Sequence, residues 1–94
     1  MKFLTTFKIN KGFDRWLTLI DELQPYMEKY EYKMIFACTN DDETRVWDMG
    51  KAKNADLVND LLNDKEVINL RSEAGVDLES SEVLSMITKH KIWQ

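Results

Sequence analysis

The feature that most constrains this fold is a stretch of strand-like sequence with apolar side chains on both faces. Residues 34–47, MIFACTNDDETRVW, indicate two strands joined by a hydrated turn over residues 40–43. Alternation divides the first strand into two sets, Met34, Phe36 and Cys38 on one face and Ile35, Ala37 and Thr39 on the other. Such a sheet needs cover on both faces, and a chain of 94 residues has little material to supply it.

The rest of the chain predicts further strands and two main helices. Strands are expected over residues 2–9, 32–39 and 44–49 and within residues 78–88, where residues 83–88 give the strongest signal. Apolar residues recur at steps of three and four over residues 13–30, which predicts a helix that begins after Gly12 and is interrupted at Pro25.

The second half of the chain carries its own helix signals. Asn54 is a candidate N-cap for the second main helix. Asn63 followed by Glu66 resembles a capping box and predicts a further short helix, which Gly75 would end.

This order of elements predicts the fold class. Strand, helix, strand, strand, helix, strand is typical of an α+β, ferredoxin-like βαββαβ fold with a four-stranded antiparallel sheet. We expect one domain over residues 1–94, with the two main helices on one face. Because the other face is also apolar, we predict a homodimer through this open sheet face, with an interface of about 1,600 Å².

Charge and composition narrow the possible partners. A formal net charge of −4 argues against nucleic acid, whose binding needs a basic patch. No apolar run approaches the roughly 20 residues that a membrane span requires, so we expect no membrane insertion. Cys38 is the only cysteine, which excludes an internal disulfide and a multi-cysteine zinc site. We therefore expect a cytoplasmic protein without a metal or another cofactor.

Several segments resemble a known group of proteins. The element order, the two-sided sheet, the helix start at residues 13–17 (FDRWL) and the late strand AGVDLESSEVLSMI at residues 74–87 resemble the dimeric α/β-barrel superfamily. Within it, the chain is most similar to a family of short bacterial proteins without an assigned function. The resemblance implies two subunits packed sheet to sheet, each with a small pocket between its sheet and its helices. Members include cofactor-independent monooxygenases, haem-degrading enzymes, cyclases and isomerases, so the fold assigns no chemistry.

Single residues carry little catalytic signal. The haem-degrading branch combines an asparagine on the first strand, a tryptophan on the third and a histidine on the second helix, and only Trp47 matches. His90, the only histidine, lies between two lysines beyond the last strand and is expected to be exposed. Cys38 is expected to be a buried structural thiol. The acidic turn lacks the spacing of a calcium loop.

Four residues remain as candidate ligand contacts. Arg45 and Trp47 share one face of a strand, and an arginine among apolar groups must find an anion or reach water. Trp16 and Tyr30 lie on the first helix, which would form one wall of a pocket. Packing, or for Arg45 pairing across a dimer, is the interpretation we favour over ligand contact for all four.

Three functional hypotheses follow. The first is a small homodimer that binds a small hydrophobic or aromatic ligand, with no reaction assigned. The alternative is a cofactor-independent enzyme of monooxygenase, cyclase or isomerase type that acts on an aromatic or polyketide-like substrate. Its mark would be a tyrosine, arginine or histidine directed into a roomy cavity that opens to solvent. The third is an assembly subunit with a filled interior and an exposed apolar patch.

Overall fold

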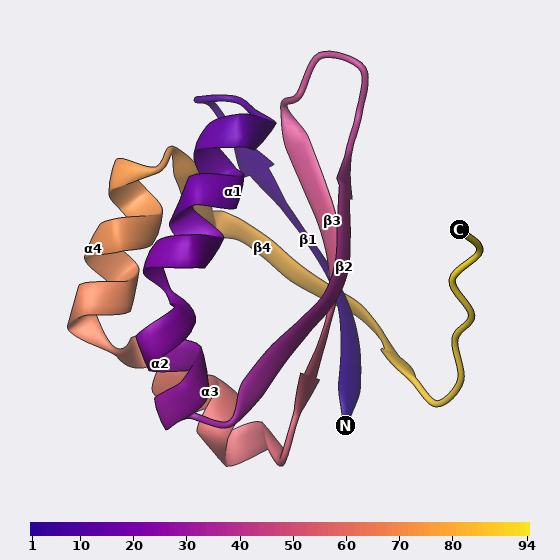
Figure 1. Cartoon of the computed structure of the whole chain (residues 1–94). Coiled ribbons are helices and arrows are strands. Elements are labelled where there is room, and N and C mark those ends of the chain that lie inside the picture. Colours follow the sequence, from indigo (N-terminus) through magenta and orange to yellow (C-terminus); the bar gives the residue numbers. More distant parts are fainter.

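A four-stranded antiparallel sheet forms one layer of the molecule, and the helices form a second layer on one of its faces (Figure 1). The computed structural model describes residues 1–94. The elements are β1 (Lys2–Ile9), α1 (Phe13–Glu22), α2 (Gln24–Lys29), β2 (Tyr32–Thr39), β3 (Arg45–Ala52), α3 (Ala55–Asn63), α4 (Lys65–Glu73) and β4 (Val76–Ile87). The strand order β2-β3-β1-β4, with every neighbouring pair antiparallel, is that of a ferredoxin-like fold and confirms the predicted class.

Local signals set most helix ends as predicted. The first helix breaks at Leu23, and Pro25 lies in the first turn of α2, where its missing N–H costs least. The Asn54 side chain accepts a hydrogen bond from the backbone N–H of Leu57 at 2.9 Å and so caps α3. Gly75 follows α4 with φ +88°, a left-handed conformation that glycine adopts without strain.

The predicted capping box at Asn63 is wrong by one residue. Asp64 is the N-cap of α4, and its side chain accepts from the backbone N–H of Glu66 at 3.0 Å. Asn63 instead forms the last turn of α3. Only Asp64 separates α3 from α4, so this one residue is both the C-cap of α3 and the N-cap of α4.

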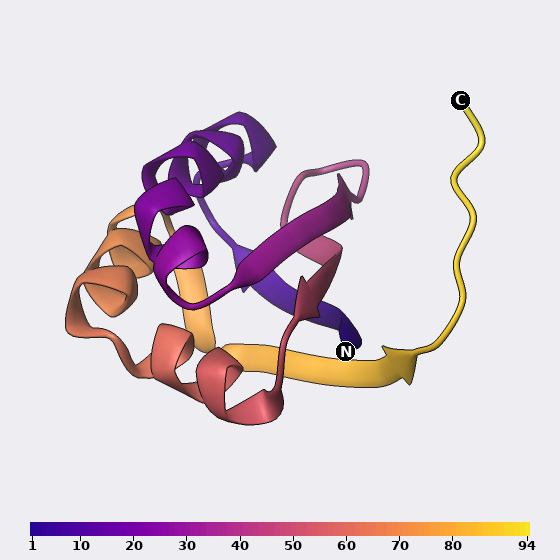
Figure 2. The same cartoon turned by 60° about the horizontal axis from the view of Figure 1, so that its bottom comes forward.

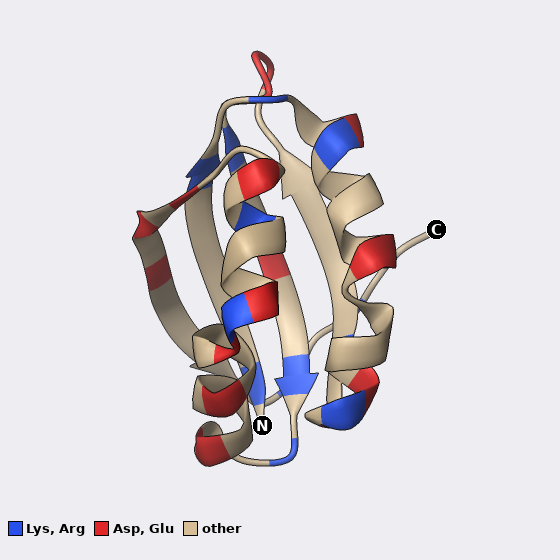
Figure 3. Cartoon of the chain, turned by 90° about the vertical axis from the view of Figure 1, so that its left-hand side faces the viewer, with Lys and Arg blue, Asp and Glu red and all other residues tan.

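The core lies between the sheet and the helices. Its buried members include Phe7 from β1, Trp16 and Leu19 from α1, Val46 from β3 and Val67 from α4. Both helical pairs therefore pack on the same side, and Figure 2 shows this side separated from the open face by the sheet. In Figure 3, seen from the helix side, charged residues colour the helices and the ends of the sheet, whereas most of the sheet behind the helices is tan.

A β-bulge changes which side chains of β2 share a face. The pairing with β3 shifts between Met34, opposite Gly50, and Phe36, opposite Met49. Met34 therefore faces the helices, and only Phe36 and Cys38 face the open side. The prediction that Met34, Phe36 and Cys38 share a face is wrong, because the alternation assumed no extra residue and a bulge adds one.

A second irregularity lies in β4. Ser85 is opposite Leu4, but Val83 is opposite Thr5, so Leu84 is the extra residue between them. Met86 is opposite Phe3, and Phe3 and Thr5 both line the helix-facing side of β1. Met86 and Val83 therefore share a side, although strict alternation along a strand would place residues three apart on opposite faces and Met86 with Leu84.

The open face of the sheet is apolar at its centre. The residues on this face pair across neighbouring strands: Leu4 of β1 and Phe36 of β2 with Met49 of β3, and Cys38 of β2 with Trp47 of β3. Phe36 is 37% exposed, and Cys38 is exposed in the single chain, so the prediction of a buried thiol is wrong for the isolated subunit. Beyond β4 the chain continues as an extended tail that runs away from the body (Figures 1 and 2). Trp93, in this tail, is 82% exposed.

Candidate functional site

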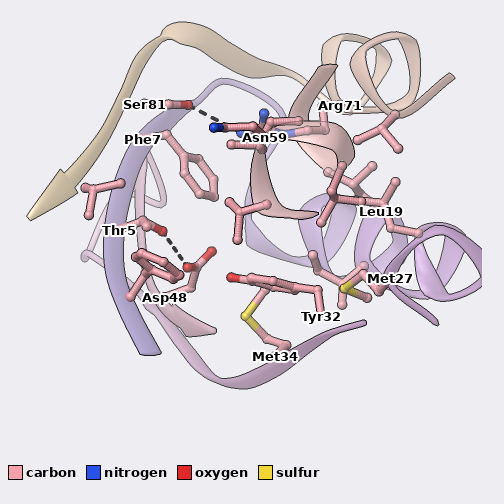
Figure 4. Close-up of a pocket in the computed structure, with 18 of the residues that line it drawn as sticks. Thr5, Phe7, Leu19, Met27, Tyr32, Met34, Asp48, Asn59, Arg71 and Ser81 are labelled. Carbon is pink, nitrogen blue, oxygen red and sulfur yellow. Dashed lines mark hydrogen bonds between the residues drawn. The ribbon is translucent and has the colours of Figure 1, made fainter. Parts of the chain in front are cut away.

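A cavity of about 330 Å³ lies between the helix-facing side of the sheet and the helices (Figure 4). Fifteen of the twenty-one residues that line it are hydrophobic, so its walls suit an apolar molecule. Its volume falls at the lower end of the range that small-molecule pockets occupy, about 300 to 1,000 Å³.

The cavity opens to solvent between α3 and β4. The exposed residues among its lining come mainly from these two elements: Ala55, Asn59 and Leu62 from α3, and Ser81, Glu82 and Val83 from β4. The deep walls come from buried residues of α1 and the sheet, including Leu19 and Phe7. A ligand would therefore enter beside α3 and come to rest against the sheet.

Asp48 is the one carboxylate on the deep wall. It lies on β3, only 4% of its surface is exposed, and its Oδ1 accepts a hydrogen bond from the Thr5 hydroxyl at 2.5 Å. The Thr5 hydroxyl is the one protein group that donates a hydrogen bond to this carboxylate, so its other oxygen, Oδ2, is left to the solvent in the cavity. Burial raises the pKa of Asp48 to about 6, although the Thr5 hydrogen bond and the charge of Arg71 act in the opposite direction. The carboxyl group therefore exchanges its proton close to neutral pH.

Tyr32 points its hydroxyl into the cavity towards Asp48 (Figure 4). It comes from β2, and its hydroxyl, which has no hydrogen-bond partner within the protein, is reached by solvent in the cavity. Burial is the main cause that raises the pKa of Tyr32 above its ordinary value, and the nearby Asp48 adds to it. The phenol therefore stays protonated and offers a donor to whatever occupies the cavity.

Arg71 lies across the cavity, on α4 near the entrance. Its Nη2 donates to the Ser81 hydroxyl at 3.3 Å, and its guanidinium carbon lies 5.7 Å from the centre of the Phe7 ring. Burial lowers the pKa of Arg71, whereas Asp48 and Tyr32 act to raise it, and a guanidinium remains charged in any case. Arg71 and Asp48 form no salt bridge within 4.0 Å, so the cavity contains two separated opposite charges.

The structure separates the four residues singled out from the sequence. Trp16 lines the cavity, is 2% exposed and packs against Phe13 with ring centres 5.6 Å apart. Tyr30 lies outside the cavity at the end of α2 and donates to Asp64 Oδ2 at 2.7 Å. Arg45 and Trp47 lie on the open face.

The two open-face residues have their own neighbours. Arg45 Nη1 donates to the Thr6 hydroxyl at 3.2 Å, and Trp47 is opposite Cys38 in the ladder. Of the four, the structure therefore brings only Trp16 to the cavity.

The sequence analysis did not identify the polar residues of the cavity, although the positions of two of them in the sequence pattern indicate which way their side chains point. Asp48 interrupts an apolar strand at a position that alternates with Trp47 and Met49, so its side chain must point to the opposite face from theirs. Arg71 follows the buried Val67 by four residues, which places it on the same face of α4. Tyr32 carried no comparable signal, because a tyrosine at the start of a strand is ordinary.

The remaining polar candidates lie elsewhere. His90 is exposed in the tail, with its Nδ1 3.2 Å from the Lys2 ammonium nitrogen. No three or more His, Cys, Asp or Glu side chains are grouped in a way that could hold a metal ion. None of the helices is long and apolar enough to span a membrane.

Comparison with known proteins supports the fold and leaves the function open. No protein-family model matches the chain, and no curated protein does. Among solved structures, the chain is similar to one titled "Structural Genomics, protein YJCS", with a TM-score of 0.56 and 17% sequence identity. The match covers 92% of this chain and 98% of that one. At this identity the likeness shows a shared fold alone.

Proposed function

We propose that the protein binds a small, largely apolar organic molecule in the cavity between its sheet and its helices. The observation that carries this proposal is the combination of an open, apolar cavity of about 330 Å³ with polar groups whose hydrogen-bonding capacity is unused. Protein interiors normally close such spaces, because an unfilled cavity forfeits packing energy. The buried Asp48 also costs stability, and costly buried ionisable groups are found mainly at functional sites, so a ligand site explains both features together.

We further propose that two subunits associate through the open sheet face, as in the dimeric α/β-barrel superfamily. Phe36, Cys38 and Trp47 place apolar surface at the centre of this face, where water would otherwise cover it. A free thiol at Cys38 suits a reducing compartment, so the cytoplasm is the proposed location.

One observation favours the alternative, a cofactor-independent enzyme of monooxygenase, cyclase or isomerase type on an aromatic or polyketide-like substrate. Tyr32 and Arg71 line a cavity that opens to solvent, which is the feature expected to mark such an enzyme. A carboxylate with a pKa of about 6 is suited to take up a proton near neutral pH, and phenol and guanidinium donors can stabilise a developing oxyanion. We assign no reaction.

A fluorophore titration tests the binding proposal. Nile red, which brightens in apolar surroundings, should bind the purified protein with saturation. The variant Asn59→Trp places a large ring at the cavity entrance, and we expect it to weaken binding at least about tenfold, since the indole occupies the ligand's path.

Asp60→Trp is the matched control. Asp60 is the next residue of α3, is also exposed and does not line the cavity, so this variant should bind Nile red as the natural chain does. Equal binding by both variants, or no saturable binding by the natural chain, contradicts the proposed function.

A further inference from the structure

The polar groups of the cavity are divided between two ends. Asp48 and Tyr32 lie together at the sheet, whereas Arg71 and Ser81 lie together near the entrance (Figure 4). The walls between them are apolar and include the aromatic rings of Phe7 and Trp16. An occupant that satisfies both ends must therefore be apolar in its middle and polar at two separate points.

The inner end fits a hydroxyl group. Asp48 Oδ2 is a hydrogen-bond acceptor with no protein donor, and it is held in place because Thr5 binds the other oxygen of the same carboxylate. The Tyr32 hydroxyl beside it is a donor with no protein acceptor. A ligand hydroxyl can donate to Asp48 and accept from Tyr32 at the same time, which a carbonyl or an ammonium group cannot.

The outer end fits an oxygen that only accepts. Arg71 has five N–H donors and no acceptor, and Ser81 takes up just one of these donors. Its contact with the Phe7 ring restrains the guanidinium, which lines the cavity, so donors not used by Ser81 are available to an occupant. A carbonyl oxygen can accept from two of these donors without bringing a further charge.

Charge balance favours a neutral ligand. Inside the cavity, Asp48 and Arg71 give one negative and one positive group, whereas the third charged lining residue, Glu82, is exposed to solvent at the entrance. An added anion would lie in the same low-dielectric space as Asp48, and an added cation in the same space as Arg71, each at a desolvation cost. A hydroxyl and a carbonyl satisfy the two ends without adding a charge.

Deepening the ligand-binding function proposed above, we propose that the cavity selects a neutral hydroxylated aromatic carbonyl compound. Its hydroxyl binds between Asp48 and Tyr32, its aromatic body lies against Phe7 and Trp16, and its carbonyl oxygen accepts from Arg71. A two-ring compound with groups at opposite ends is small enough for a cavity of about 330 Å³.

Calorimetric titration of the whole chain with four naphthalene compounds tests this assignment. The parent probe is 6-propionyl-2-naphthol, which has a hydroxyl at one end and a carbonyl at the other. 2-Propionylnaphthalene lacks the hydroxyl, its 6-methoxy derivative caps the hydroxyl, and 2-naphthol lacks the carbonyl. We expect the parent to bind about ten- to one-hundredfold more tightly than each of the others, the range for one hydrogen bond to a charged group.

Two variants, one for each end of the cavity, test which residue binds the hydroxyl and which binds the carbonyl. Asp48→Asn keeps the shape of the side chain but turns a donor towards the cavity, so the preference for 6-propionyl-2-naphthol over 2-propionylnaphthalene should fall to less than about threefold. Arg71→Met keeps the apolar stem and should remove the preference for 6-propionyl-2-naphthol over 2-naphthol while leaving the preference for the hydroxyl. Circular dichroism confirms that each variant is folded.

The outcomes separate this assignment from the function on which it rests. Equal binding of the four compounds to the natural chain, or preferences that survive in both variants, overturns the ligand class and leaves ligand binding intact. If none of the four compounds binds while Nile red still binds, the ligand class is likewise overturned and ligand binding is left intact. If Nile red also fails to bind, the proposed function itself is wrong and the ligand class falls with it.

Discussion

The hydroxyl of Tyr32 occupies the space directly above Gly50, where a Cβ atom would collide with it. The two residues lie on the neighbouring strands β2 and β3, with Met34 opposite Gly50 in the ladder. Because glycine has no side chain, the phenol can lie across β3 and reach the cavity beside Asp48. Gly50 thereby sets the position of a polar group that we assign to the ligand site.

Gly50→Ala should therefore destabilise the protein. The added methyl group displaces the Tyr32 ring from a packed position, and overpacking of this kind costs about 1 to 3 kcal/mol of unfolding free energy. Urea denaturation followed by circular dichroism measures this cost. In a Tyr32→Ala background the same change should cost clearly less, because the colliding ring is gone. An equal cost in both backgrounds would show that the collision is not the cause.

Asp48→Asn should stabilise the ligand-free protein above pH 6 and leave it nearly unchanged below pH 4. The folded-state pKa of Asp48, about 6, lies above its ordinary value of 3.8, so the unfolded chain releases this proton first as the pH rises. Stability consequently falls between about pH 4 and pH 6, by up to about 3 kcal/mol, and stays reduced at higher pH. Asparagine does not ionise and so avoids this loss.

Urea denaturation of both proteins from pH 4 to pH 8 measures this difference. Asp41→Asn, in the exposed turn between β2 and β3, is the control and should follow the natural chain at every pH. A stability difference between Asp48→Asn and the natural chain that does not change with pH would argue against a buried, ionising Asp48.

Phe36→Asp should weaken the proposed dimer. A carboxylate at this position would have to be buried without a partner charge when two open faces meet, and such burial costs several kcal/mol. Sedimentation equilibrium should show a dimer for the natural chain and a shift towards monomer, by at least about one hundredfold in dissociation constant, for the variant.

Leu17→Asp is the matched control for the dimer. Leu17 is 43% exposed and Phe36 is 37% exposed, but Leu17 lies on α1, on the opposite side of the sheet. We expect Leu17→Asp to leave the association unchanged. A natural chain that sediments as a monomer at micromolar concentration contradicts the dimer, whatever the variants do.

Asn54→Ala should lower stability by about 1 kcal/mol, because it removes the side-chain acceptor that caps α3. Asn54→Asp retains an acceptor at the same place and should recover most of the loss, since a negative charge is also favourable at a helix N-terminus. Thermal unfolding of the three chains measures the effect. Asn69→Ala, at an exposed position within α4, should not destabilise, because alanine favours a helix interior.

Local sequence patterns predicted β1 and β2 with the bounds that the structure shows, residues 2–9 and 32–39. They succeeded because alternation and β-branched or aromatic composition act within a few residues of the chain. The face assignment of Met34 failed because a bulge inserts one residue and reverses the alternation beyond it. Nothing in the local composition marks that insertion, since it depends on the register against β3.

In the candidate site too, local sequence patterns predicted some features, and the tertiary structure decided the others. Helical spacing brought Trp16 to the inner side of α1, where it does line the cavity. Arg45 and Trp47 shared a strand face as expected, but which face the helices would cover was decided by the packing of the whole chain. Asp48 and Arg71 come from elements that are distant in sequence, so their sharing one cavity could not be derived from either segment alone.

By itself, the sequence determined the order and type of the elements and hence the ferredoxin-like class, because hydrophobic period, helix caps and chain breaks are local properties. The tertiary structure alone decided which strand face became interior, where the sheet left a cavity unfilled and which polar groups line it. These outcomes depend on strand register and on the packing of helices against a twisted sheet, and small shifts in either one move a side chain from the interior to the open face.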